Sequence, residues 1–291
     1  MRAALIPNID SRRAIRVRMQ AAAMRLRLPF RSRVWRGPSG AWQGAGAGSS
    51  IDFQDHRAYL PGDDPRHIDW QAYARSGQYT MKLYREEVSP AVDLVLDVSA
   101  SMFVTPEKAN RVLELFYFSL ESARQSGAAL QCYVLRGAES AHWPVEAALG
   151  DGDWTGLRYQ KMQFALPWRQ GSLRALISDL LFPGAPDPLL TMLGTARGSG
   201  VIFAPFAVQE SAPDWEGNIE FIDCESELRR VQQVNPALLE RYQAAYRRHF
   251  ALWTEASQRR RVVLARVGEE PDFLAAMRRD ALARGAVEMC A

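Results

Sequence analysis

The chain has 291 residues, of which 47% are hydrophobic and 24% are charged. This composition is typical of a globular protein and excludes a collagen-like or mostly disordered chain. No stretch approaches the roughly 18 consecutive apolar residues of a membrane span, and the N-terminus lacks the apolar segment of a secretory signal. The three cysteines, Cys132, Cys224 and Cys290, show no Cys-x-x-Cys spacing, which favours a reduced compartment. We therefore expect a cytoplasmic protein without a membrane span.

Positive charge is concentrated at the N-terminus. The net charge of the chain is +3, but residues 1–40 contain ten arginines and a single acidic residue, Asp10. Residues 9–28 are predicted to form a basic amphipathic helix, because apolar residues recur on one stripe. The residues of this stripe are Ile15, Met19, Ala22 and Leu26. Our main interpretation is a solvated helix that docks on the protein; the alternative is recruitment to an anionic lipid or nucleic-acid surface, and nucleic acid is the less expected partner.

The composition then changes twice along the chain. Residues 37–50 are glycine-rich and are predicted to be a linker or mobile loop. Residues 51–88 are polar, aromatic and rich in turns, with a strand predicted over 79–86. The sequence therefore divides into a basic N-terminal helix (1–36), a glycine-rich loop with a short β-rich segment (37–88), and a larger C-terminal domain (89–291).

The larger domain alternates strands and helices. Predicted strands cover residues 91–96, 129–135, 173–178, 201–208, 219–222 and 262–267, and predicted helices cover 105–125, 188–196, 236–260 and 273–284. The first strand is almost entirely apolar, as expected for a strand buried on both faces. This alternation predicts an α/β fold with a doubly wound, mostly parallel sheet.

Oxygen-bearing side chains follow two of the predicted strands. Asp97, Ser99 and Ser101 come after the first strand at a spacing of two, and Asp179 follows the strand that ends at Ser178. In doubly wound sheets, ligands bind beyond the carboxyl ends of the strands. A carboxylate and hydroxyls suit a hard cation such as Mg²⁺ or Mn²⁺. The alternative is that these polar residues only cap the helix that follows.

Two segments carry a resemblance to known families. The Asp97-x-Ser99-x-Ser101 pattern with the later Asp179 resembles the metal-ion-dependent adhesion site (MIDAS) of von Willebrand factor type A domains. The segment from Arg57 to Trp70 is similar to the signature of the domain of unknown function 58 family, which implies a type A fold preceded by a short β-rich segment. The signature residues are Arg57, Tyr59, Gly62, Asp63, Arg66, Asp69 and Trp70. The resemblance also implies a protein partner, a MoxR-type AAA+ ATPase or its client, and a role in complex assembly or maturation.

Two parts of these patterns leave alternatives open. The adhesion site usually includes a threonine from an intermediate loop, and Thr155 is the candidate by its order along the chain. For the signature segment we expect a docking element, in which arginines and aspartates form buried ion pairs while Tyr59, Ile68 and Trp70 pack on the sheet. The first alternative is that this segment binds a partner. A metal cluster is the minor alternative; its ligands would be Asp63, Asp64, His67 and Asp69.

The sequence lacks the common catalytic motifs. It contains no Gly-x-Ser-x-Gly elbow, no P-loop and no His-Glu-x-x-His helix. Position 99 is a serine where aspartyl-phosphate enzymes commonly place a second acid. We therefore expect a non-catalytic protein-interaction module with a Mg²⁺ site. The alternatives are a metal-dependent phosphoester hydrolase that uses the same carboxylates, and an anionic-surface binder that uses the basic helix.

Overall fold

The structure, a computed structural model, describes residues 5–31, 42–47, 53–136, 139–149 and 168–290. The chain forms two units. Residues 1–30 and 91–291 make up the larger unit, and residues 31–90 make up the smaller one. Each unit is described by itself below.

A mostly parallel sheet forms the centre of the larger unit. Its strands, in spatial order, are β12 (Val263–Gly268), β9 (Ser199–Phe206), β8 (Leu173–Ile177), β5 (Ala91–Asp97), β6 (Ala129–Arg136) and β7 (Glu139–Trp143). Among these strands only β7 is antiparallel, and it pairs with β6 at the edge. In chain order this arrangement is 3-2-1-4-5-6 read from β7, the order of doubly wound nucleotide-binding folds. The predicted α/β class with a mostly parallel sheet is confirmed.

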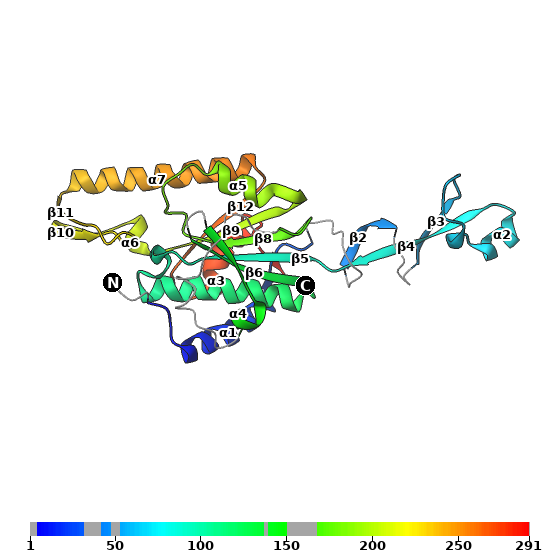
Figure 1. Ribbon diagram of the computed structural model, residues 1–291, viewed down its shortest axis with the longest axis horizontal. Coiled ribbons are helices and arrows are strands. Elements are labelled where there is room, and N and C mark those ends of the chain that lie inside the picture. The colour runs from blue at the N-terminus through cyan, green and yellow to red at the C-terminus, as the bar shows by residue number, and fades with distance from the viewer. Residues whose placement is uncertain (1–4, 32–41, 48–52, 137–138, 150–167, 291) are drawn as a thin grey trace. The chain divides into compact units, whose positions relative to one another are not determined.

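Helices cover both faces of this sheet (Figure 1). On one side lie α5 (Asp187–Gly194) and α7 (Pro236–Arg259), and on the other lies α3 (Pro106–Gln125). The central strands β5 and β8 are buried along nearly their whole length, which explains their continuous apolar runs. Shorter helical segments are η2 (Ala100–Phe103), α4 (Val145–Leu149), η4 (Thr195–Arg197), α6 (Val208–Ser211), α8 (Phe273–Ala276) and the π-helical η5 (Met277–Leu282).

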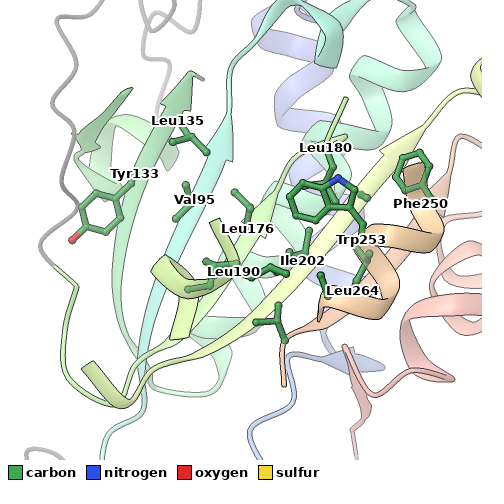
Figure 2. Packing of buried hydrophobic residues seen from close by; sticks show 14 of the residues in the cluster. Val95, Tyr133, Leu135, Leu176, Leu180, Leu190, Ile202, Phe250, Trp253 and Leu264 are labelled. Atoms are coloured by element: carbon green, nitrogen blue, oxygen red, sulfur yellow. The ribbon is translucent and has the colours of Figure 1, made fainter. Parts of the chain in front are cut away.

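The hydrophobic core on the α7 side joins helix to strands (Figure 2). Trp253 of α7, 1% exposed, packs in one cluster with Ile202 of β9 and Leu264 of β12. The same cluster continues to Leu176 of β8 and Val95 of β5. Burial of this apolar surface fixes the strand ends in place and so positions the loops that follow them.

The N-terminal helix docks on the larger unit. Helix α1 (Ile9–Ala23) buries the predicted apolar stripe and packs outside α3 (Figure 1). Arg16 Nε lies 2.8 Å from an oxygen of the fully buried Glu121, and Arg18 lies 3.1 Å from Glu114. The helix ends five residues earlier than predicted, because the short strand β1 (Leu26–Arg27) pairs with β13 (Glu288–Met289).

The smaller unit contains an antiparallel sheet of the order β2-β4-β3. Its strands are β2 (Trp42–Ala47), β3 (Phe53–Ala58) and β4 (Thr80–Val88), with η1 (Pro65–His67) and α2 (Trp70–Ser76) between β3 and β4. The prediction of a linker over 37–50 is wrong for residues 42–47, because backbone pairing with β4 makes them a strand despite their glycines.

One predicted strand lies outside the central sheet. Strand β10 (Gly217–Ile222) pairs only with β11 (Arg229–Val234), as an antiparallel hairpin, among the residues that the structure describes. Its side chains alternate between half-buried and exposed, which is typical of a strand covered on one face. The expectation that residues 219–222 continue the parallel sheet is therefore wrong.

No described helix is long and apolar enough to cross a membrane.

The ion pair between Arg16 and Glu121 provides a test of the docked helix. We expect Arg16→Met to lower the free energy of unfolding by about 1–3 kcal/mol, because the buried Glu121 then loses its closer arginine and keeps the half-exposed Arg124 at 3.2 Å. The control is Arg259→Met, since Arg259 is 65% exposed and 3.8 Å from Glu255; its effect should stay within about 0.5 kcal/mol. Urea unfolding measures both, and equal effects would contradict a docked helix.

Candidate functional site

The candidate site lies where the strand order reverses. Strands β5 and β8 are neighbours at the centre of the sheet, but the chain leaves β5 toward β6 and leaves β8 toward β9 on the opposite side. The chain therefore turns to opposite sides after these two strands, and this carboxyl edge is where doubly wound folds bind their ligands. Asp97 ends β5, and Ser178 and Asp179 directly follow β8.

A single carboxylate joins the two loops. Asp97 is 3% exposed, and its Oδ1 accepts hydrogen bonds from the backbone N–H of Ser99 (2.9 Å) and from Ser99 Oγ (2.6 Å). Its Oδ2 accepts a hydrogen bond of 2.6 Å from Ser178 Oγ, on the other loop. The two strand ends that the sequence analysis paired therefore meet at Asp97.

The two serines after Asp97 bring their hydroxyls together. The turn η2 begins after Ser99, and Ser99 Oγ lies 3.3 Å from Ser101 Oγ. Neighbouring oxygens in the octahedral shell of Mg²⁺ lie ~3 Å apart, given metal–oxygen distances of about 2.1 Å. The hydroxyl pair, with the Asp97 carboxylate beside it, thus has the donor set and spacing that suit a magnesium ion.

Asp179 is held differently from the expectation. Its Oδ2 accepts a 2.8 Å hydrogen bond from Lys108 Nζ, and its Oδ1 accepts one of 3.1 Å from the backbone N–H of Leu181. The same ammonium lies 2.5 Å from Glu210 Oε1, and the Lys108 side chain is fully buried. Both oxygens of Asp179 are therefore engaged by the protein, so this carboxylate is in the first place the partner of a lysine.

Lys108 is the residue that the sequence analysis missed. It occupies the third position of α3, after the cap Thr105, where the positive end of the helix dipole disfavours a cation. It is also one of only three lysines in a chain rich in arginine. A lysine in this unfavourable position indicates a specific carboxylate partner, and this signal was available from the sequence.

Negative charge exceeds positive charge among these buried groups. Burial, and then the neighbouring Asp179, raise the pKa of Asp97 to about 6, although hydrogen bonds from Ser178 and Ser99 oppose the shift. Burial raises the pKa of Glu210, against the influence of Lys108. Burial alone would lower the pKa of Lys108, but Asp179 and Glu210 raise it overall. The Lys108 ammonium thus binds two carboxylates, Asp179 and Glu210, while Asp97 accepts hydrogen bonds from hydroxyls and a backbone N–H. An added cation would offset the remaining negative charge.

The remaining predicted ligand cannot be compared with this geometry, because Thr155 lies outside the described residues. The cap of α3 is Thr105, whose Oγ1 accepts a hydrogen bond of 3.1 Å from the N–H of Lys108. The alternative that Asp97, Ser99 and Ser101 only cap this helix therefore does not hold for α3. Their side chains instead contact one another in the loop before it.

The signature residues lie in the smaller unit. Arg57 donates two hydrogen bonds, of 2.7 and 2.6 Å, to Asp63. These bonds, and to a smaller extent the hydrogen bond from the N–H of Leu60, lower the pKa of Asp63. The turn needs a glycine, because Gly62 has φ +105°. Tyr59 packs near Tyr79, at 6.1 Å between ring centroids.

The expected buried ion pairs of the signature are only partly formed. Arg66 pairs with Asp64 at 2.7 Å, but its side chain is 86% exposed. Asp69 caps α2, and its Oδ2 lies 2.8 Å from His56 Nε2, an interaction that chiefly lowers the pKa of Asp69 to about 2. Trp70 is 58% exposed, so the expectation that it packs on the sheet is wrong; as the first residue of α2 it lies edge-on to Tyr73 and Tyr79 instead.

The minor alternative of a metal cluster in the signature is not supported. The carboxylates of Asp63 and Asp64 are paired with arginines, and Asp69 is engaged by His56 and two backbone N–H groups. Over the described part of the chain, no three His, Cys, Asp or Glu side chains gather as they would around a metal ion.

The pKa of Asp97 generates a stability prediction. Because the folded state binds this proton more tightly than the unfolded state, Asp97 makes stability fall as the pH rises from about 4 to about 6. Asp97→Asn removes this cost and should raise the free energy of unfolding at pH 7.5, in metal-free buffer, by on the order of 1–3 kcal/mol. Urea unfolding from pH 4.5 to 8 measures this, and a wild-type advantage at pH 7.5 would contradict it.

The buried lysine generates a second prediction. We expect Lys108→Met to cost about 3–5 kcal/mol of unfolding free energy, because Asp179 and Glu210 would stay buried without a cation. Arg260→Met is the matched control, since it breaks an exposed 3.0 Å ion pair with Asp187 in the same unit and should cost at most about 1 kcal/mol. Similar losses in the two variants would show that Lys108 has no special role.

Comparisons with known proteins agree with the signature. Searches of curated proteins and of solved structures gave no match. Residues 55–148, roughly a third of the chain, match the model of the family described as "Protein of unknown function DUF58". The match includes the signature, Asp97 to Ser101 and Lys108, so the resemblance to this family is confirmed over these residues.

Proposed function

We propose that this chain is a non-catalytic protein-interaction module of the von Willebrand factor type A kind, with a Mg²⁺-dependent adhesion-type site. The observation that carries the proposal is the hydroxyl pair of Ser99 and Ser101, 3.3 Å apart, beside the buried Asp97 at the switch point of the sheet. This is the place where doubly wound folds bind ligands, and these are the oxygens that a hard cation prefers.

The residues of the site would divide the work between them. Ser99, Ser101 and Asp97 would hold the ion, with Mn²⁺ as a substitute and Thr155 as the expected further ligand. Asp179, hydrogen-bonded to Lys108, would not contact the ion but would add negative charge near it. Bound magnesium supplies a positive centre that can join these oxygens to a carboxylate of a partner protein.

The surroundings of the serines favour binding over catalysis. A nucleophilic serine needs an adjacent base, and the carboxylate beside Ser99 Oγ is that of Asp97, whose other oxygen is held by Ser178. The Nε2 atom of His249 lies 2.8 Å from the carbonyl oxygen of Leu180, in the loop after β8. The alternative of a phosphoester hydrolase would use the same carboxylates, and both oxygens of Asp179 are already engaged, by Lys108 and by the N–H of Leu181.

The smaller unit offers a second surface for a partner. Tyr73 and Tyr79 stack at 4.5 Å between ring centroids, and Trp70 lies edge-on to both. Trp70 and Tyr79 are 58% and 49% exposed. Exposed aromatic clusters of this kind are typical of protein interfaces. Trp70 belongs to the family signature, and all three residues lie within the matched segment 55–148.

The basic helix favours docking over recruitment to an anionic surface. Arg16, Arg18 and Arg27 face acidic residues of the larger unit, namely Glu121, Glu114 and Glu288. Their charge is therefore largely used within the protein. From the family resemblance, the partner would be a MoxR-type AAA+ ATPase or a client that it remodels.

The test is capture of a MoxR-type ATPase from the same source by the immobilised full chain. With Mg²⁺, wild type should retain the ATPase, and EDTA or Asp97→Ala should reduce capture at least about tenfold, because the bridge loses its cation or an anchor. Asp187→Ala, which removes an exposed aspartate of the same unit, should bind like wild type. Calorimetric titration with Mg²⁺ alone should show the same pattern. Capture that ignores both EDTA and Asp97→Ala would reject the proposed function.

A further inference from the structure

The tip of the β10–β11 hairpin reaches the serine loop. Glu225 lies in the turn between these strands, and its Oε1 accepts a hydrogen bond of 3.0 Å from the backbone N–H of Ser101. A carboxylate of this chain therefore already lies on the loop that would receive a partner's carboxylate. The contact also shows that the loop presents a backbone donor suited to an anionic oxygen.

The conformation of the tip presents Glu225 to the loop. Asp223 Oδ1 accepts hydrogen bonds from the N–H of Glu225 (3.0 Å), the N–H of Ser226 (2.7 Å) and Ser226 Oγ (2.9 Å). The N–H of Asp223 donates to the carbonyl oxygen of Leu228 at 2.9 Å and closes the turn. This network is internal to the tip, so the tip keeps its shape whether or not it contacts Ser101.

The rest of the hairpin is only partly buried. Its strands pair with each other and lie beside the first part of α7, outside the central sheet (Figure 1). Between hairpin and helix remains a groove of about 360 Å³, whose lining includes Trp215, Phe221 and Tyr242. Leu228 and Val231 are 73% and 70% exposed. Because these side chains are exposed, the tip can leave the N–H of Ser101 without uncovering a large apolar surface.

We infer that Glu225 is an internal ligand of the Ser99–Ser101 loop, which an acidic side chain of a partner displaces when it docks. The inference rests on the proposed function for the identity of the loop as a docking site. It adds that the site is closed from within, by the hairpin tip, before a partner arrives. Binding of any carboxylate is then weakened by competition with Glu225.

The test uses fluoroacetate as the carboxylate probe and the full chain in excess Mg²⁺. Broadening of the ¹⁹F resonance reports binding to wild type, Glu225→Ala and Glu220→Ala. Glu225→Ala should bind the probe about tenfold more tightly than wild type, because the competing carboxylate is gone. Glu220→Ala removes the same charge from β10 and should behave as wild type, since Glu220 pairs with Arg229 within the hairpin.

The outcomes separate this inference from the proposed function. Tighter binding by Glu225→Ala that disappears in EDTA supports both. Tighter binding that persists in EDTA supports the role of Glu225 but contradicts the magnesium bridge. Equal binding by wild type and Glu225→Ala, equal gains in both glutamate variants, or no binding by any of them overturns the inference.

Discussion

The burial of the Asp97 carboxylate at the end of β5 is the constraint on which the arrangement of the site depends. A buried carboxylate needs hydrogen-bond donors, and here they come from Ser99 on its own loop and Ser178 on the loop after β8. Each donor fixes the position of its loop. The same interaction therefore satisfies a buried charge and brings together two segments that diverge at the switch point.

Charge balance extends this arrangement to the helices. Lys108, in the first turn of α3, forms ion pairs both with Asp179, which follows β8, and with Glu210 of α6. Glu210 Oε2 also accepts a hydrogen bond of 3.0 Å from the N–H of Ala207, which follows β9. The lysine thus ties the start of α3 to the ends of two strands. Because one ammonium pairs with two carboxylates and Asp97 lies nearby, the carboxylates at this edge of the sheet outnumber the cations.

The family match and the site overlap only in part. The matched residues 55–148 include the smaller unit's signature, β5 and α3. Ser178, Asp179, Glu210 and Glu225, which complete the polar cluster, come from beyond the matched segment. The matched portion therefore supplies Asp97, the serines and Lys108, while the later strands supply their partners. The exposed Trp70 and Tyr79 add a separate surface, in the smaller unit.

The sequence by itself determined the α/β class, the buried strands and the place of Asp97, Ser99 and Ser101 at a strand end. These features follow from local hydrophobic patterns, capping residues and spacing, which a short window of sequence contains. Other features depend on segments far apart in the chain. The glycine-rich residues 42–47 form a strand because they pair with β4. Strand β10 lies outside the parallel sheet because it pairs with β11. Two hydrogen bonds also depend on the tertiary structure: Lys108 donates to Asp179, and the N–H of Ser101 donates to Glu225. Sequence alone does not predict them, because the packing of sheet, helix and hairpin sets the distance between these groups.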